Sequence, residues 1–186
     1  MASSSPALVK AARHHAPAAW DTLLKQHQLP LYAYIVELVR NDATARDILQ
    51  ETFANAVRHI AGLRDDARFS AWLFGIAHQK CVQHWRRVRR TDAVFAPAAA
   101  DESPEDWPDT ETFDPVTTLL RREQADEFFA LVEQLPVPQR SALLLHVLED
   151  FSLEEIAGIT GAPVGTIKSR LHHAKRALRQ LVEAAR

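Results

Sequence analysis

The sequence predicts an all-α protein in which two small helical domains are joined by an acidic flexible linker. Apolar residues recur at helical spacing along almost the whole chain, without the two-residue alternation of half-buried strands. One internal stretch instead combines prolines and acids with few large apolar side chains, a composition typical of linkers. With 186 residues, 47% of them hydrophobic, the chain is long enough to form two packed cores.

Changes in composition divide the chain into four parts. We expect a flexible N-terminal tail at 1–17, a first domain at 18–90, the linker at 91–117 and a second domain at 118–186. Every ionised side chain from 101 to 114 is acidic, whereas arginine and lysine gather in the segments on either side. The formal net charge of -2 therefore says less about partners than the local charge does.

Four helices are expected in the first domain. An apolar stripe begins at Trp20, and Pro30 is expected to open a second helix. Residues 48–60 show the clearest amphipathic pattern, with a broad apolar face and polar residues opposite. A fourth helix begins near Phe69 and runs into an arginine cluster at 86–90. This domain thus has one core and one strongly basic end.

Helical periodicity resumes after the linker. One helix ends at Pro136, and Pro138 is expected to start the next, with Leu143 and Leu144 pointing inward. No internal repeat is present.

The segment after residue 150 predicts a helix-turn-helix. Ser152 and Glu155 have the spacing of a capping box, so a short helix should begin directly after Ser152 and continue to about Thr160. Gly161 suits the left-handed position that ends such a helix. A second helix is expected from Val164, directly after a proline that suits a first helical turn.

The second helix of this pair has the character of a DNA-reading element. Ile167, Leu171, Ala174 and Leu178 recur at the spacing of a buried face. The remaining faces carry the candidates for DNA contact: Thr166, Lys168, Ser169, Arg170, His173 and Arg176. A basic helix alone is more often a solvated surface. Together, the cap, the turn glycine and the positive charge favour a helix that enters the major groove.

Three stretches in this order resemble a known family: "ARDILQETFANAV", "RFSAWLFGIAHQK" and "EEIAGITGAPVGTIKSRLHHAKRAL". The chain resembles a bacterial RNA polymerase sigma factor of the extracytoplasmic-function subgroup, from about Trp20 to Leu181. The resemblance implies a subunit that binds core RNA polymerase and directs promoter-specific transcription initiation. In such proteins the first domain binds the polymerase and opens the minus-ten element, and the second reads the minus-thirty-five element.

The resemblance also implies roles for individual residues. The matching polar face in the family docks on a coiled coil of the largest polymerase subunit, which here points to Asp47, Gln50 and Glu51. Contacts to the opened minus-ten strand are expected from polar and basic residues of the fourth helix: His78, Gln79, Lys80, Gln83, His84, Arg86 and Arg87. Donors and cations there suit a displaced strand and a flipped base. Trp72 is assigned to the core.

No catalytic or cofactor chemistry is predicted. The sequence contains no nucleophile–base pair, phosphate loop or paired carboxylate site, so we expect no enzyme activity and no cofactor. His78, Cys81 and His84 follow three-residue steps, but those steps turn around a helix and lack a fourth ligand, so no metal site is predicted. Cys81 is the only cysteine, which excludes an intramolecular disulfide.

Several partners are expected from the resemblance. They are core RNA polymerase, promoter DNA and an anti-sigma factor or other inhibitory regulator. No stretch is apolar enough to insert in a membrane and no signal peptide is evident, so a cytoplasmic location is expected. A stand-alone helix-turn-helix regulator is the main alternative, and a purely protein-binding adaptor is another.

One departure from the family pattern points to modification. Family members commonly carry Asp-Ala-Glu-Asp where this chain has Thr44, Ala45, Arg46 and Asp47, so two acids at the edge of the polymerase-binding face are missing. A phosphate on Thr44, added by a serine/threonine kinase, would restore negative charge at a helix start. The competing interpretation, ranked first, makes Thr44 a simple N-cap with Asp47 completing its box.

Overall fold

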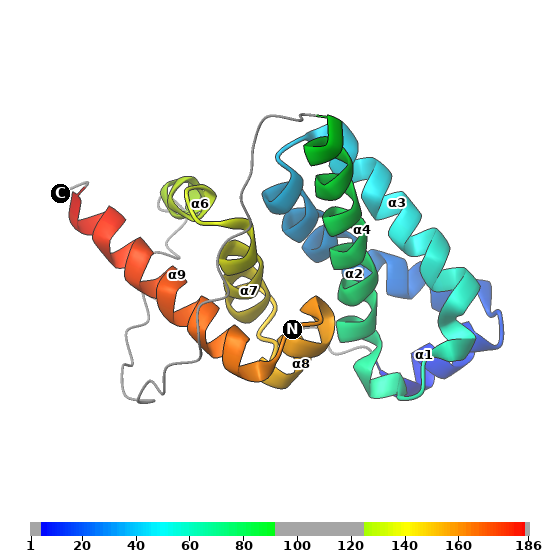
Figure 1. Cartoon of the computed structure of the whole chain (residues 1–186). Helices are drawn as coiled ribbons and strands as arrows, with labels where there is room; N and C mark the ends of the chain where they lie inside the picture. Colours follow the sequence, from blue (N-terminus) through cyan, green and yellow to red (C-terminus); the bar gives the residue numbers. More distant parts are fainter. Residues whose placement is uncertain (1–4, 92–124, 185–186) are drawn as a thin grey trace. The chain divides into compact units, whose positions relative to one another are not determined.

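The computed structural model describes residues 5–91 and 125–184, and within these two ranges the regular structure is helical, without strands. Contacts divide the chain into two compact units, an N-terminal one built on α1 to α4 and a C-terminal one built on α6 to α9 (Figure 1). The predicted all-α fold is confirmed. Apart from its first residue, the predicted linker at 91–117 lies outside the described residues.

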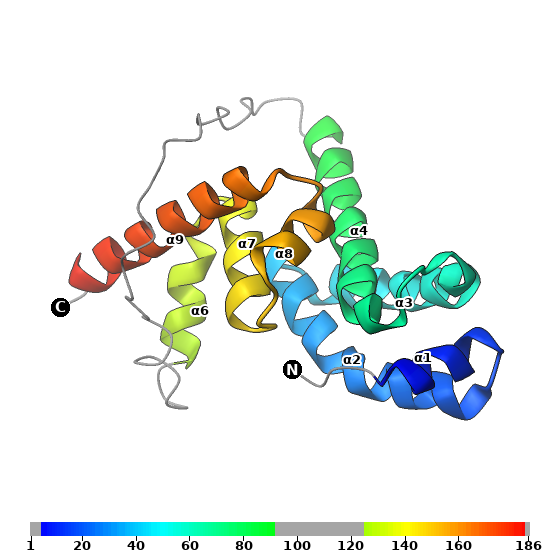
Figure 2. The same cartoon turned by 90° about the horizontal axis from the view of Figure 1, so that it is seen from below.

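The N-terminal segment is partly helical, which corrects the expectation of a flexible tail. Helix α1 (Pro6–Arg13) buries Val9 and Ala12 completely against the first unit. The indole nitrogen of Trp20 donates a hydrogen bond to the Ala12 carbonyl at 3.0 Å, and Figure 2 shows α1 close to the start of α2 (Pro17–Val39). The sequence signal was weak because the packed face of α1 consists of two small side chains.

Pro30 does not open a new helix, contrary to the sequence prediction. It lies inside α2, which continues for 23 residues. A proline within a helix removes the hydrogen bond to the carbonyl four residues earlier. That carbonyl belongs to Gln26, which is exposed, so water can satisfy it. The buried residues on both sides of Pro30, such as Leu23 and Leu31, hold the helix together despite this lost bond.

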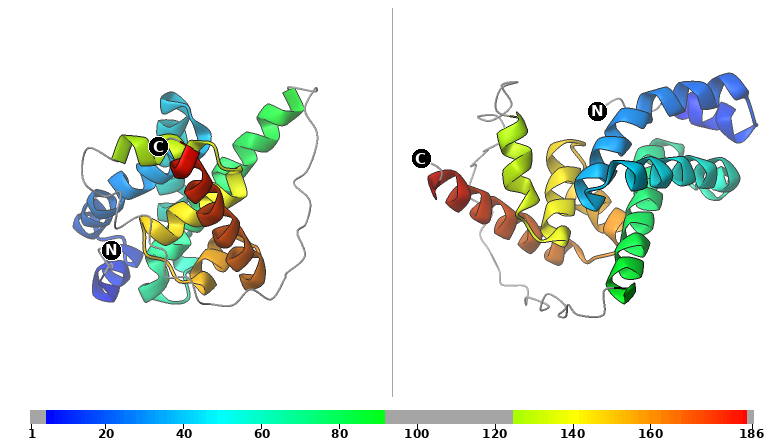
Figure 3. Two further views of the ribbon diagram at one scale, coloured as in Figure 1. Left: turned by 90° about the vertical axis from the view of Figure 1, so that its left-hand side faces the viewer. Right: turned by 90° about the horizontal axis from the view of Figure 1, so that it is seen from above.

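Helices α2, α3 (Asp42–His59) and α4 (Phe69–Thr91) pack against one another and enclose the core of the first unit (Figure 3). Tyr34 of α2 and Phe74 of α4 are almost completely buried, with ring centroids 5.5 Å apart. Two short 3₁₀ turns, η1 (Ile60–Gly62) and η2 (Asp66–Arg68), connect α3 to α4. The Arg13 guanidinium fastens α1 to this connection by donating to the Leu63 carbonyl at 2.6 Å.

The second unit consists of α6 (Ala125–Glu133), α7 (Val137–Val147), α8 (Leu153–Thr160) and α9 (Val164–Ala184). Its centre is formed by Leu143, Leu144 and Leu145, all fully buried, where α7 packs against α9.

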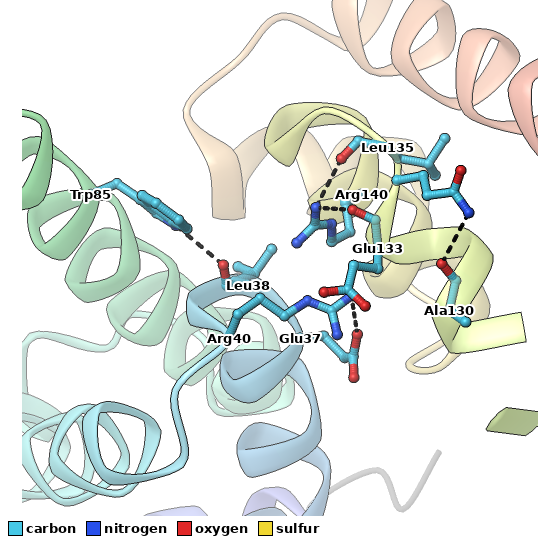
Figure 4. Close-up of polar contacts among 9 residues, drawn as sticks. Glu37, Leu38, Arg40, Trp85, Ala130, Glu133, Leu135 and Arg140 are labelled. Carbon is cyan, nitrogen blue, oxygen red and sulfur yellow. Dashed lines mark hydrogen bonds and ion pairs between the residues drawn. The ribbon is translucent and has the colours of Figure 1, made fainter. Parts of the chain in front are cut away.

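Arg140 fixes the turn between α6 and α7. It is 7% exposed, and its guanidinium donates to the carbonyls of Glu133 at 2.5 Å and Leu135 at 3.0 Å (Figure 4). The last carbonyls of a helix have no partner within the helix, so a basic side chain placed there satisfies them. A buried charge thus fixes the angle at which α6 meets α7.

The local geometry of the helix-turn-helix follows the sequence prediction closely. The Ser152 hydroxyl accepts from the Glu155 amide at 3.2 Å, and the Glu155 carboxylate accepts from the Ser152 amide at 2.9 Å, which completes the capping box. Gly161 ends α8 with a φ of 70°. The Ile167 amide donates to the Pro163 carbonyl at 3.1 Å, so the proline lies in the entry to α9 as predicted.

Two glycines of this segment provide a matched pair of variants. Gly161→Ala should lower the free energy of unfolding by about 1 kcal/mol, because a left-handed backbone strains a residue with a Cβ atom. Gly158→Ala adds the same methyl group inside α8, where nothing lies within 4 Å of it, and should raise stability by up to about 1 kcal/mol. Urea denaturation of the two variants should show opposite signs. Equal shifts would contradict the role given to Gly161.

Candidate nucleic-acid and polymerase interfaces

Helix α9 leaves most of the residues predicted to contact the minus-thirty-five element exposed or half-buried. Ile167, Ala174 and Leu178 are at most 1% exposed and form its packed face. Lys168 and Arg176 are exposed, and the other candidates apart from Ser169 are half-buried: Thr166, Arg170 and His173. A basic face on a helix that follows a tight glycine turn can approach the major groove with its first turns.

Ser169 does not share this exposure. Its exposed fraction is 8%, so it is buried although it carries a hydroxyl group. His172 lies four residues from Lys168 and from Arg176, is half-buried rather than buried, and was not singled out from the sequence. Counting in steps of four from Lys168 would have found it, because residues four apart share a helix face. The solvent-facing stripe therefore includes His172 in place of Ser169.

The polar side of α4 is divided between exposed and anchored side chains. Gln79, Gln83, Arg86 and Arg87 are exposed, whereas His78, Lys80 and His84 are half-buried. One ring nitrogen of His78 lies 2.8 Å from the Tyr34 hydroxyl, which ties this side chain to α2. Of the residues predicted to contact the minus-ten strand, those on the exposed stripe are best placed to do so.

Hydrogen bonding or burial also involves three further side chains of α4: Trp85, Cys81 and His84. The Trp85 indole donates to the Leu38 carbonyl at 3.2 Å and fastens α4 to the end of α2 (Figure 4). Burial raises the pKa of the Cys81 thiol to about 12, so the thiol stays neutral. Burial, together with the nearby Arg87, lowers the pKa of His84, so its ring is neutral near pH 7. His78, Cys81 and His84, which follow one another at steps of three residues, are thus held by a hydrogen bond or by burial.

The polar face of α3 carries Asp47, Gln50 and Glu51, all exposed as the sequence predicted. Glu51 forms an ion pair with Lys80 of α4, with 2.6 Å between the carboxylate oxygen and the ammonium nitrogen. Hydrogen bonding and charge attraction from Lys80 lower the pKa of the Glu51 carboxyl. The structure therefore joins a residue expected to meet polymerase with one expected to meet DNA.

Thr44 is not the N-cap of α3, which corrects that interpretation. The cap is Asn41, whose side chain accepts a hydrogen bond from the Thr44 amide at 2.8 Å. Thr44 lies in the first turn and is half-buried. The unusual Arg46 pairs with Asp42 at 2.8 Å, so part of its positive charge is balanced within α3.

Both units match known protein families. Residues 23–91 match the family model of Sigma-70 region 2, and residues 125–178 match that of Sigma-70, region 4. The chain belongs to the sigma-70 family. It is 32% identical to the RNA polymerase sigma-H factor of Pseudomonas aeruginosa over 164 residues, which cover 86% of this chain and 84% of the relative.

Further relatives place this sigma factor in the extracytoplasmic-function group. The ECF RNA polymerase sigma factor SigL of Mycobacterium tuberculosis is 32% identical over 163 residues, covering 87% of this chain and 88% of the relative. The sigma factor RpoE of Bartonella quintana, solved with the anti-sigma factor NepR, matches with a TM-score of 0.63 and 26% identity. That match covers 89% of this chain and 99% of RpoE.

The chain is therefore a sigma factor that directs RNA polymerase to promoters, as its sequence predicted. In the ranges that the structure describes, none of the helices is long and apolar enough to cross a membrane.

The exposure pattern of α9 gives a prediction for adjacent residues. Lys168→Ala should weaken use of the minus-thirty-five element, since a lost base contact costs about 1 to 3 kcal/mol. Arg170→Ala should have a similar effect, whereas Ser169→Ala should leave promoter use close to wild type, because Ser169 is buried.

The measurement is transcription by the reconstituted polymerase on promoters selected from a random library, with the upstream element intact or scrambled. The loss for Lys168→Ala should vanish on scrambled templates, and affinity for core polymerase should not change. A Ser169→Ala defect as large as that of Lys168→Ala would contradict the assignment of the exposed stripe.

Proposed function

We propose that this sigma factor uses α3 to dock on core RNA polymerase, α4 to hold the opened minus-ten strand and α9 to read the minus-thirty-five element. The observation that supports this most strongly is that each of three helices carries an exposed polar face of its own. The α3 face contains two carboxylates and an amide, whereas the exposed residues of α4 and α9 are mostly basic or amide side chains. Phosphate-rich DNA suits the latter two faces, and a basic protein surface suits the first.

The α4 face favours single-stranded DNA for a chemical reason. Gln79 and Gln83 can donate to and accept from base edges, and Arg86 and Arg87 follow on the same exposed side toward the helix end. An unpaired base exposes edges that duplex DNA hides, so amides for bases and cations for phosphates are the groups required. The proposed strand-holding residues are therefore the exposed four, with Lys80 added from the half-buried set.

An inhibitory partner is also part of the proposal. The related sigma factor of Bartonella quintana was solved with an anti-sigma factor, and we infer a comparable antagonist for this chain. A surface that binds polymerase must be covered when target genes are silent, because free sigma factors compete for the same core enzyme. The chain acts in the compartment that holds the polymerase, the cytoplasm, and catalysis stays with the polymerase.

The decisive experiment is reconstitution. Purified chain added to core RNA polymerase should start transcription at selected promoters, and polymerase alone should not. A stand-alone regulator would instead bind duplex DNA without polymerase and alter transcription by an already complete holoenzyme. Failure to initiate on every selected template would refute the proposal.

Charge reversal tests the α3 face. Asp47→Arg and Glu51→Arg should each reduce affinity for core polymerase by at least tenfold, about 1.4 kcal/mol, and the double variant should abolish binding. A like-charge contact across an interface costs more than the loss of one attraction. The matched control is Asp21→Arg, an exposed acid on α2. Equal loss for the control would show a general charge effect and contradict a local interface.

Modification of Thr44 completes the proposal. The Asn41 cap leaves the Thr44 hydroxyl unnecessary for starting α3, and an anion in the first turn of a helix is favourable by about 0.3 to 1 kcal/mol. A phosphate there would replace charge that the family carries in its acidic residues. A serine/threonine kinase is thus the proposed activator.

Two variants of equal size separate charge from shape at this position. Thr44→Glu should raise affinity for core polymerase and transcription above wild type, whereas Thr44→Gln should not. Protein made without any kinase provides the baseline. Equal behaviour of the two variants would leave Thr44 without a regulatory role.

A further inference from the structure

The ion pair between Glu51 and Lys80 connects two surfaces that were assigned to different partners. The residues lie 29 positions apart on α3 and α4, and their charged atoms are 2.6 Å apart. Glu51 retains 61% of its side-chain exposure, whereas Lys80 retains 24%. The lysine is thus the more enclosed partner, and the carboxylate is bound to its ammonium group.

The field around Glu51 extends beyond this pair. Lys80 has the largest effect in lowering the pKa of the Glu51 carboxyl, and Arg87 of α4 and Arg58 of α3 act in the same direction. Arg87 and Arg58 are both exposed. Cations of two helices therefore act on one carboxylate, and Lys80, which contacts it directly, can bind a phosphodiester as well as a carboxylate.

We propose that Lys80 binds one backbone phosphate of promoter DNA, and that Glu51 occupies this position in the free chain. A phosphodiester carries one negative charge, as a carboxylate does, so the exchange leaves the charge balance of the site unchanged. An exposed ion pair contributes little to stability, so breaking it costs little. The inference rests on the proposed function, because it needs α4 to face DNA.

The exchange makes polymerase binding and DNA binding support each other. A Glu51 carboxylate that turns toward a cation of the polymerase leaves Lys80 available for a phosphate. Conversely, a phosphate on Lys80 releases Glu51 for polymerase. Such a coupling is reciprocal by thermodynamic necessity, so either partner should favour the other by the same factor.

The first test measures binding of the full-length free chain to a fluorescent single-stranded oligonucleotide at low salt. Glu51→Gln should tighten binding by about two- to fivefold, the range expected when an exposed ion pair no longer competes. The dependence of log affinity on log salt should steepen by about 0.7, corresponding to one added phosphate contact. Thermal unfolding should confirm that the variant keeps its fold.

Two controls separate a phosphate site from a general gain of positive charge. Asp21→Asn also removes one acid from an exposed pair, with Lys25 at 2.7 Å, on a different helix, and should change oligonucleotide affinity by less. In a Lys80→Gln background, Glu51→Gln should have no further effect. Equal gains for Glu51→Gln and Asp21→Asn, or a gain that persists without Lys80, would overturn the proposal.

The second test uses the reciprocal partner. Lys80→Gln should increase affinity for core polymerase in the absence of DNA, because Glu51 is no longer held by the lysine. Lys25→Gln removes the same charge from the Asp21 pair and serves as the control. An unchanged or weaker affinity for Lys80→Gln would overturn the coupling. If the unaltered protein initiates transcription in the reconstituted assay, such a failure contradicts this inference but not the proposed function.

Discussion

The packing of α4 against α2 and α3 is the constraint on which the first unit depends. Phe69, Leu73, Ala77 and Cys81 follow one another at steps of four residues and are at most 1% exposed. The Trp85 hydrogen bond to the Leu38 carbonyl continues the same seam into the basic end of the helix. Once this stripe is buried, helical geometry decides which side chains remain outside. Gln79, Gln83 and Arg86 then face solvent, because they do not belong to the buried stripe.

The second unit depends on a much shorter helix, α8. An eight-residue helix such as α8 is marginal by itself, since its ends leave many backbone groups without partners. The reciprocal capping box at Ser152 satisfies two donors at one end, and the left-handed Gly161 ends the other. These local features set the direction in which α9 leaves the turn. The packing of Ile167, Ala174 and Leu178 then leaves the basic stripe of α9 exposed.

Structural features that depend on neighbouring residues could be predicted from the sequence, whereas those that depend on tertiary packing could not. The capping box and the turn glycine fixed both ends of α8 to the residue, because capping chemistry involves neighbours in the chain. Helix α1 has no clear sequence signal because Val9 and Ala12 form only a small apolar stripe. Pro30 resembles a helix start in the sequence, but burial on both sides of it outweighs one lost hydrogen bond. The burial of Ser169 could not be predicted from its polarity.

The pair between Glu51 and Lys80 could not have been found from sequence, since it joins residues 29 positions apart on two helices. Its exposure suits it to the proposed exchange of partners. A buried ion pair broken on one side leaves a costly uncompensated charge, whereas an exposed one can release either member to water or to a new partner at little cost. Under the proposed function both units contact DNA from one polymerase, so weak contacts of this kind would be sufficient, because the first contact makes the second effectively intramolecular. Specificity can then be built from many contacts that would each be too weak alone.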